Sequence, residues 1–252
     1  MVKVRVARLG PVREVTLARA EKRNALDAEM LEALRAAYSA PPEKDERVSV
    51  IRAEGPAFCA GLDLRQRADG GGPGSGAIEA MLEAIQAHPL PVVALVQGDA
   101  IAGGAELAFH CDFVVANEEA RIGMSLARIG LAPSWFLARK ILEVAGPVAA
   151  REILLLGEPI AAARLAALNL IHRAVPAGEL EAAAGSIIER LCANAPLSLR
   201  AMKAVLVRAM AFRETIPHQD IDALIAAAGA SGDAREGISA LLERRTPRFE
   251  GR

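Results

Sequence analysis

A short apolar segment that leads through a glycine corner into a helix constrains this chain more than any other feature. Residues 91–96 (PVVALV) are apolar and rich in β-branched side chains, which predicts a buried strand. Gly98, Gly103 and Gly104 follow, and because glycine has no Cβ they allow a tight backbone path close to a ligand. We expect the first turns of a helix over residues 105–110. The stretch therefore predicts a strand–loop–helix unit.

The corner of this unit has the properties of an anion site. The first N–H groups of a helix have no partner inside the helix, and they lie at the positive end of its dipole. Such a site suits an anion or a developing oxyanion. Glu106 falls in the first turn, where it would be a titratable group close to those donors. The alternative is an ordinary connection that carries a solvated glutamate.

A second corner of the same kind precedes the first. Residues 48–52 predict a short strand, and the loop 55–64 (GPAFCAGLDL) comes soon after it. Two such units can bring two N–H donors toward one oxygen. The alternative is that Gly61 only permits a tight turn, and we expect Asp63 to serve as a helix cap.

The other elements follow from periodicity and capping. Residues 2–6 and 12–17 alternate around Gly10-Pro11 and predict a hairpin, while 19–26 (RAEKRNAL) is a polar turn. Asp27 is a plausible N-cap of a helix over 28–39. Further helices are expected over 77–87, 134–144, 147–156, 160–168, 179–194, 199–210, 219–228 and 235–244, with a short strand near 171–175.

The segment 69–76 (DGGGPGSG) is the one low-complexity patch. It lacks the GK[ST] ending of a phosphate-binding loop, so that function is not predicted. A flexible surface loop is the simple interpretation, and a lid over a bound ligand is the alternative.

Composition excludes several classes of partner and site. With 30 basic and 31 acidic residues the net charge is −1, which does not indicate binding to nucleic acid or to a membrane surface. No apolar run approaches the roughly 20 residues that span a bilayer. The start, MVKVRVARLG, lacks a signal-peptide core, so we expect a cytoplasmic protein. The three cysteines are far apart without a CxxC motif, so neither disulfides nor a metal site is expected.

Four segments together resemble the crotonase superfamily, the enoyl-CoA hydratase/isomerase group. They are RAEKRNAL (19–26), GPAFCAGLDL (55–64), PVVALVQGDAIAGGAELAFHCDFVVA (91–116) and LLERRTPRF (241–249), in the family's order and spacing. The resemblance implies an α/β fold, a crotonase-like spiral of ββα units with a C-terminal helical trimerisation region. It places the spiral core at 1–195 and the oligomerisation region at 196–252, and it implies a homotrimer or homohexamer.

The resemblance also implies the chemistry. The substrates would be acyl-CoA thioesters, and coenzyme A would enter only as part of the substrate, without a separate cofactor. The backbone N–H groups of Leu62 and Gly103 match the two donors that hold the thioester oxygen as it becomes an enolate. Glu106 matches one of the two glutamates of the hydratases.

Contacts to the substrate are carried over in the same way. By the resemblance, Lys22 and Arg23 would lie near the CoA phosphates, where paired cations suit dense negative charge, although both could simply be solvated. Trp135 would narrow the acyl pocket or, as we favour, pack within its helix. Lys203 and Arg245 could meet CoA phosphates, of this or a neighbouring chain, although both could simply be exposed charges. The remaining contacts would be Ala25, Ala60, Leu64, Leu241 and Phe249.

One departure from the family pattern affects the predicted reaction. The second glutamate of the hydratases falls on Leu126, which can neither hold a water nor move a proton. Double-bond migration needs only one base, whereas hydration should be slowed by roughly 10²–10⁴-fold. Ser125, Arg128 and His110 are nearby in sequence, although packing is the simpler role for them. A decarboxylase or hydrolase, or a silent acyl-CoA binding protein, stays an alternative, and the acyl group is left open.

Overall fold

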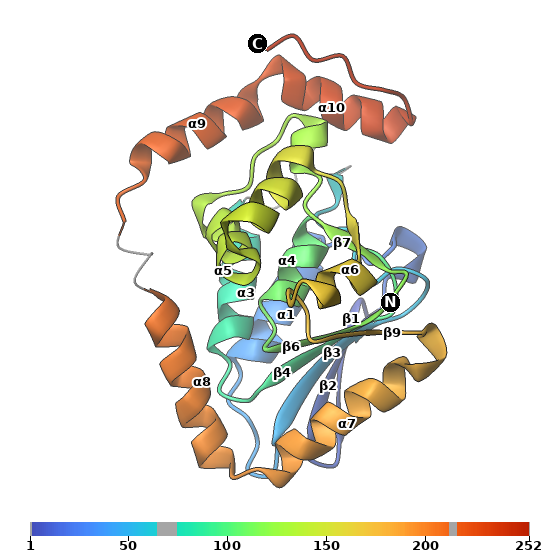
Figure 1. The fold of residues 1–252 in the computed structure, drawn as a ribbon, viewed down its shortest axis with the longest axis vertical. Helices are drawn as coiled ribbons and strands as arrows, with labels where there is room; N and C mark the ends of the chain where they lie inside the picture. Colours follow the sequence, from blue (N-terminus) through green and yellow to red (C-terminus); the bar gives the residue numbers. More distant parts are fainter. Residues whose placement is uncertain (1, 65–74, 212–215, 252) are drawn as a thin grey trace.

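A computed structural model describes residues 2–64, 75–211 and 216–251. Its main sheet has six strands in the order β1-β2-β3-β4-β6-β9, as Figure 1 shows. The strands are β1 (Val4–Leu9), β2 (Val12–Leu17), β3 (Val48–Ala53), β4 (Val92–Val96), β6 (Phe113–Asn117) and β9 (Arg173–Val175). The β1–β2 pair is the expected antiparallel hairpin, and every other neighbouring pair is parallel. A second sheet orders β5 (Ala100–Ile101), β7 (Arg121–Gly123) and β8 (Ile160–Ala161) as β5-β7-β8.

The central strands are buried on both faces, which is why they appear as continuous apolar runs rather than as alternating ones. In β4, Ala94 packs into the larger core with α1 (Ala28–Ser39), α3 (Ser75–Ala87) and α4 (Gly103–Phe109). Leu95 packs on the other face with α7 (Leu180–Ala193). Helix α1 begins where expected, because Asp27 accepts a hydrogen bond of 3.0 Å from the Met30 amide.

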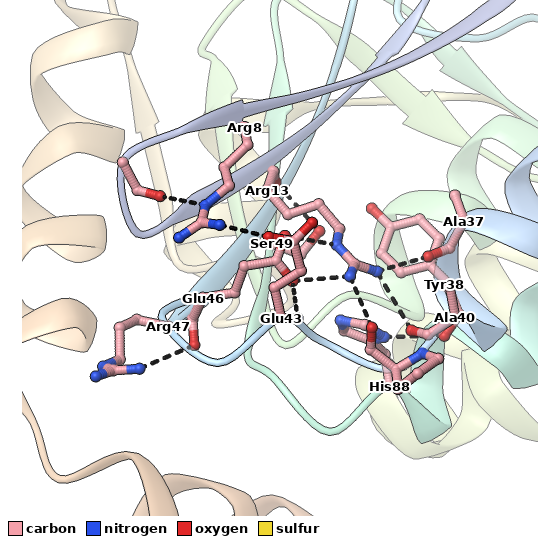
Figure 2. A network of polar contacts seen from close by, with 12 residues as sticks. Arg8, Arg13, Ala37, Tyr38, Ala40, Glu43, Glu46, Arg47, Ser49 and His88 are labelled. Atoms are coloured by element: carbon pink, nitrogen blue, oxygen red, sulfur yellow. Dashed lines mark hydrogen bonds and ion pairs between the residues drawn. The ribbon is translucent and has the colours of Figure 1, made fainter.

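A buried ion pair ties the hairpin to the end of α1 (Figure 2). The Arg13 guanidinium lies 2.7 Å from the Glu46 carboxylate and also donates to the Ala37 carbonyl oxygen at 2.8 Å. Next to this pair, His88 Nδ1 is 2.9 Å from the carbonyl oxygen of Tyr38. These polar groups satisfy the last turn of the helix, whose carbonyls have no partner within it.

The second half of the chain is mainly helical. It contains α5 (Trp135–Arg151), α6 (Ala162–Ala167), α7, α8 (Pro196–Met210), α9 (Gln219–Ala230) and α10 (Gly232–Glu243), with short helical turns at Leu126–Ile129, Glu152–Leu156 and Ala177–Glu179. Another short helical turn, Ala20–Lys22, precedes α1. The two helices expected on either side of Gly146 form one element that bends at this residue, where φ is +64°. Residues 160–161, expected to begin a helix, instead form β8 because they pair with β7.

The C-terminal helices extend away from the sheet. Helix α8 runs along one side of the molecule, and α9 and α10 pass over the end opposite to the turn between α7 and α8 (Figure 1). Within the described residues, none of the helices has the length and apolar character needed to cross a bilayer. The predicted lid over 69–76 falls almost entirely outside the described residues.

Candidate active site

A cleft of about 950 Å³ is enclosed by the two glycine corners, the turn 19–26, the segment 124–137 and helices α9 and α10. The fold therefore brings together residues from both ends of the chain. The predicted site residues that line the cleft are Lys22, Arg23, Ala25, Ala60, Leu62, Leu64, Gly103, Leu126 and Leu241.

The two corners are in direct contact at the wall of this cleft. A Cβ on Gly104 would lie 2.1 Å from the Cys59 carbonyl oxygen, so the two backbones touch where side chains would keep them apart. Gly61 has φ of +86°, and a Cβ there would lie 3.1 Å from Gly103 N. A Cβ on Gly103 would in turn lie 3.6 Å from Leu62 N. The amides of Leu62 and Gly103 are therefore neighbours, each on its own corner.

Both of these amides are left without a backbone acceptor by the residues that the structure describes. Among the backbone hydrogen bonds of the described residues, Leu62 N and Gly103 N do not act as donors. The adjacent Asp63 amide does donate, to the Leu26 carbonyl oxygen at 2.9 Å. Gly103 opens α4, so its N–H is one of the helix's first donors. Ala102 precedes it at φ +49° and ψ −114°, a sparsely populated conformation of the kind that occurs at functional sites.

Glu106 lies in the same helical turn but is fully buried, and it is not among the residues that line the cleft. Both of its carboxylate oxygens lack a hydrogen-bond partner. Burial raises the pKa of this carboxyl well above its ordinary value, although the positive charge of Lys140 acts in the opposite direction. The structure therefore places behind the cleft wall a carboxyl group whose neutral form is favoured by burial.

Two other predicted contacts lie outside the cleft. Trp135 begins α5 and stacks on the ring of His218, with 5.0 Å between ring centroids, which agrees with a packing role. Phe249 is 45% exposed in the C-terminal segment. Neither side chain is among the residues that line the cleft.

Lys203 and Arg245, which could meet CoA phosphates by the resemblance, do not line the cleft and are both paired with acidic side chains. Lys203 is buried, and its ammonium lies 2.6 Å from the Asp112 carboxylate, where it fastens α8 to the sheet. Arg245 is paired with Glu236 and Glu243. The Lys203 side chain is 8% exposed, so its ion pair is internal, whereas the Arg245 side chain is 41% exposed.

The structure adds cleft residues that the sequence did not reveal. Arg244 lines the cleft, as does one face of α9 with Ala226, Gly229 and Ala230. The two adjacent arginines at 244–245 indicated a basic position near the end of α10. Which of the two lines the cleft depends on the turn that follows this helix. The sequence predicted helix α9 but did not indicate that α9 lines the cleft, because that depends on where the tertiary fold places the helix.

Charge is distributed unevenly over the lining. The charged lining residues come from the turn at 21–23, from Asp63 and from Arg244. The lining residues between 124 and 137 are uncharged, with Met124, Leu126 and Leu137 among them. The charged part of the cleft thus has three cations and two carboxylates, and the uncharged part suits an apolar chain. The described residues contain no group of three or more histidine, cysteine or acidic side chains that could hold a metal ion.

Comparisons with known proteins identify the family and the fold. A family model described as enoyl-CoA hydratase/isomerase matches residues 9–252. A putative enoyl-CoA hydratase of Thermus thermophilus is 34% identical over 255 residues, with 95% of this chain and 98% of the relative covered. A crystal structure of carnitinyl-CoA hydratase from Mycobacterium avium is 30% identical, with a TM-score of 0.86 over 99% of both chains. A methylmalonyl-CoA decarboxylase complexed with 2S-carboxypropyl-CoA is similar in fold, with a TM-score of 0.90, 23% identity and coverage of 100% of this chain and 99% of the other.

Proposed function

The chain belongs to the enoyl-CoA hydratase/isomerase family, and from this premise we propose that it polarises the thioester carbonyl of an acyl-CoA with the amides of Leu62 and Gly103. The observation that carries the proposal is the contact between the two glycine corners, which leaves two unused N–H groups side by side at the cleft wall. Donors fixed in advance are worth about 3–4 kcal/mol each to an oxyanion-like transition state. An enolate formed at this carbonyl would be stabilised in the same way.

The substrate's coenzyme A would lie along the charged part of the cleft. Lys22, Arg23 and Arg244 offer three cations for its phosphates. Ala25, Ala60, Leu64 and Leu241 are lining residues that give apolar surface for the rest of the cofactor. The acyl chain would then extend toward the uncharged segment between 124 and 137.

The reaction we propose is proton transfer between carbons, with Glu106 as the acid and base. In a 3-enoyl-CoA, the ionised carboxylate takes a proton from C2, the electron pair moves into the thioester oxygen, and the same proton returns at C4 to give the 2-enoyl-CoA. One carboxyl is sufficient because it gives back what it takes. The raised pKa favours this role, because it makes the Glu106 carboxylate a stronger base than a solvated one.

Water addition is the weaker prediction. It normally needs a second group to position the water, and the corresponding position is Leu126, an apolar residue of the cleft wall. We therefore expect hydration of crotonyl-CoA to be much slower than isomerisation.

The test uses two substrates and one variant. The purified protein is mixed with a 3-enoyl-CoA and, separately, with crotonyl-CoA, and the conjugated enoyl absorbance is followed. We expect absorbance to rise with the 3-enoyl-CoA, and Glu106→Gln to lower that rate by roughly 10²–10⁴-fold. Unchanged activity in Glu106→Gln would remove Glu106 from the mechanism. Faster loss of absorbance from crotonyl-CoA would make the protein a hydratase.

A second candidate is a protein that binds acyl-CoA without turning it over. The position of Glu106 outside the cleft lining favours it. Tight binding of acyl-CoA, with no product by mass spectrometry after long incubation and no uptake of deuterium from D₂O at C2, would support this candidate and contradict the isomerase proposal.

A further inference from the structure

His110 is a second buried titratable group beside Glu106. It lies one helical turn further along, at the end of α4, and both side chains are almost completely shielded from solvent. His110 Nδ1 is 2.8 Å from the backbone carbonyl oxygen of Glu106, so Nδ1 carries the proton and donates. The same Nδ1 is 3.5 Å from Glu106 Oε2, just beyond a good hydrogen bond.

The imidazole is held in this orientation by α5. The Phe136 ring stacks on it with 5.2 Å between centroids and 17° between the planes. The Arg139 guanidinium lies 5.5 Å from the centroid of Phe136. Because the stack and the bond to the carbonyl fix the ring plane, the Nδ1–H can serve only the Glu106 carbonyl and the nearby carboxyl.

We propose that His110 is a positioning residue for Glu106, whose Nδ1–H shifts from the backbone carbonyl onto the carboxylate whenever Glu106 gives up its proton. The inference rests on the proposed function of Glu106 as the acid and base. A buried carboxyl needs a hydrogen-bond donor more in its ionised form than in its neutral form. When it ionises, a donor 3.5 Å away needs only a small rotation of the Glu106 side chain to make a charge-assisted hydrogen bond.

The electrostatic surroundings keep His110 neutral, as this role requires. Burial, then the charge of Lys140, lowers the pKa of the imidazole to about 3, so it does not compete with Glu106 as a base. Lys140 and Arg139, both from α5, are the cations that act on the pair, and Lys140 is itself paired with Glu143. Of the other elements packed on α4, β5 brings no titratable side chain, and α3 brings half-buried Glu79 and exposed Glu83.

The test compares His110→Asn with His110→Phe. Asparagine places an N–H donor where Nδ1 stands, whereas phenylalanine keeps the ring and the stacking but removes the donor. We expect His110→Phe to raise the pH at which isomerisation reaches half its maximal rate by about one unit, which is about a tenfold loss of rate well below that midpoint. At high pH the rate should return toward that of the unchanged protein. His110→Asn should keep the original midpoint.

His88 provides the matched control. It is also buried, and its Nδ1 also lies against a backbone carbonyl, that of Tyr38, at 2.9 Å, but it is remote from the cleft lining. His88→Phe and His88→Asn should leave the pH midpoint of activity unchanged. Equal midpoints in His110→Phe and the unchanged protein, or a uniform loss of rate at all pH values in both His110 variants, would show that His110 only packs.

An infrared measurement tests whether His110 stabilises the ionised Glu106 carboxylate, and it does not require turnover. The carbonyl stretch of the neutral Glu106 carboxyl, identified by its loss in Glu106→Gln, is titrated in the protein bound to a non-reacting acyl-CoA. We expect its midpoint to rise in His110→Phe and not in His110→Asn, and an unmoved midpoint would overturn the inference. If no acyl-CoA is turned over, the proposed function fails while this titration still tests the role of His110.

Discussion

At the scale of single residues, Gly104 determines how closely the two corners approach. Replacing it with alanine would place a Cβ 2.1 Å from the Cys59 carbonyl oxygen, so one backbone must move. We expect Gly104→Ala to lower the free energy of unfolding by about 1–3 kcal/mol, the usual cost of overpacking. Because a displacement of about 1 Å can cost 10²-fold in rate, we also expect activity to fall by roughly that factor. Chemical denaturation and the isomerisation assay measure the two effects.

Gly185, in α7, is the control for this change. A Cβ there would meet nothing within 4 Å, so Gly185→Ala should be neutral or stabilising by up to about 1 kcal/mol. If the two variants behave alike, the contact between the corners is not what the glycine provides.

Leu126 is the residue that separates isomerisation from hydration in our proposal. Leu126→Glu restores a carboxylate at the cleft wall, and we expect it to raise crotonyl-CoA hydration by about 10²-fold, the lower end of what a positioned acid or base contributes. Leu126→Gln is the matched control, because glutamine has nearly the same size and shape as glutamate but carries no charge. Equal hydration rates in the two variants would contradict this interpretation of position 126.

At the scale of elements, buried histidines make the packing of α1 and α4 sensitive to acid. Burial lowers the pKa of His88 to about 4, below its ordinary value of 6.5. The unfolded chain therefore binds more protons between these values, and the stability contributed by the neutral ring is present above pH 6.5 and lost as the pH falls toward 4. The difference of about 2.5 units corresponds to about 3 kcal/mol.

This loss can be measured directly. We expect the unfolding free energy of the protein to fall between pH 6.5 and 4. Its slope against pH should be steeper than that of His88→Phe, by the amount that corresponds to about one more proton bound on unfolding. Denaturation at a series of pH values provides the comparison. Parallel slopes would show that His88 is protonated as easily in the folded protein as in the unfolded one.

Elements with local signals were predicted well from the sequence, and elements defined by distant partners were not. The Asp27 cap and the hairpin at Gly10-Pro11 depend on neighbouring residues, and the structure has both. Strand β8 exists only because it pairs with β7, and the bend at Gly146 joins two predicted helices. A local sequence pattern predicts neither which strands pair nor how two helices join.

The site residues also divide into those that a local motif predicts and those that depend on distant parts of the chain. The corner residues were predictable because the resemblance rests on contiguous motifs. The burial of Glu106 and the pairing of Lys203 with Asp112 were not, since each depends on segments far apart in the chain. The wall formed by α9 was unpredictable for the same reason.

At the scale of the whole molecule, α8 presents an unpaired apolar stripe. Met202, Val205 and Leu206 are 61–68% exposed and lie at i, i+3 and i+4, on one side of the helix. Such a stripe on a helix that extends from the body marks an interaction surface. Together with the family resemblance, it supports a homotrimer or homohexamer.

We therefore expect size-exclusion chromatography with light scattering to give the mass of three or six chains. Leu206→Glu should lower that mass, whereas Ala204→Glu, an exposed position on another side of the same helix, should leave it unchanged. A monomer before any substitution would contradict the proposed assembly and the role of residues 196–252 within it.

The cleft draws its lining from Glu21 at one end of the chain and from Arg244 at the other. During synthesis on the ribosome, a nascent chain can pair its early strands and cap α1 long before α10 emerges from the exit tunnel. Its glycine corners would then meet while one wall of the binding site is still missing. The cleft is therefore complete only after the last helix has been made, and we expect a product that ends before α10 to lack that wall of the site.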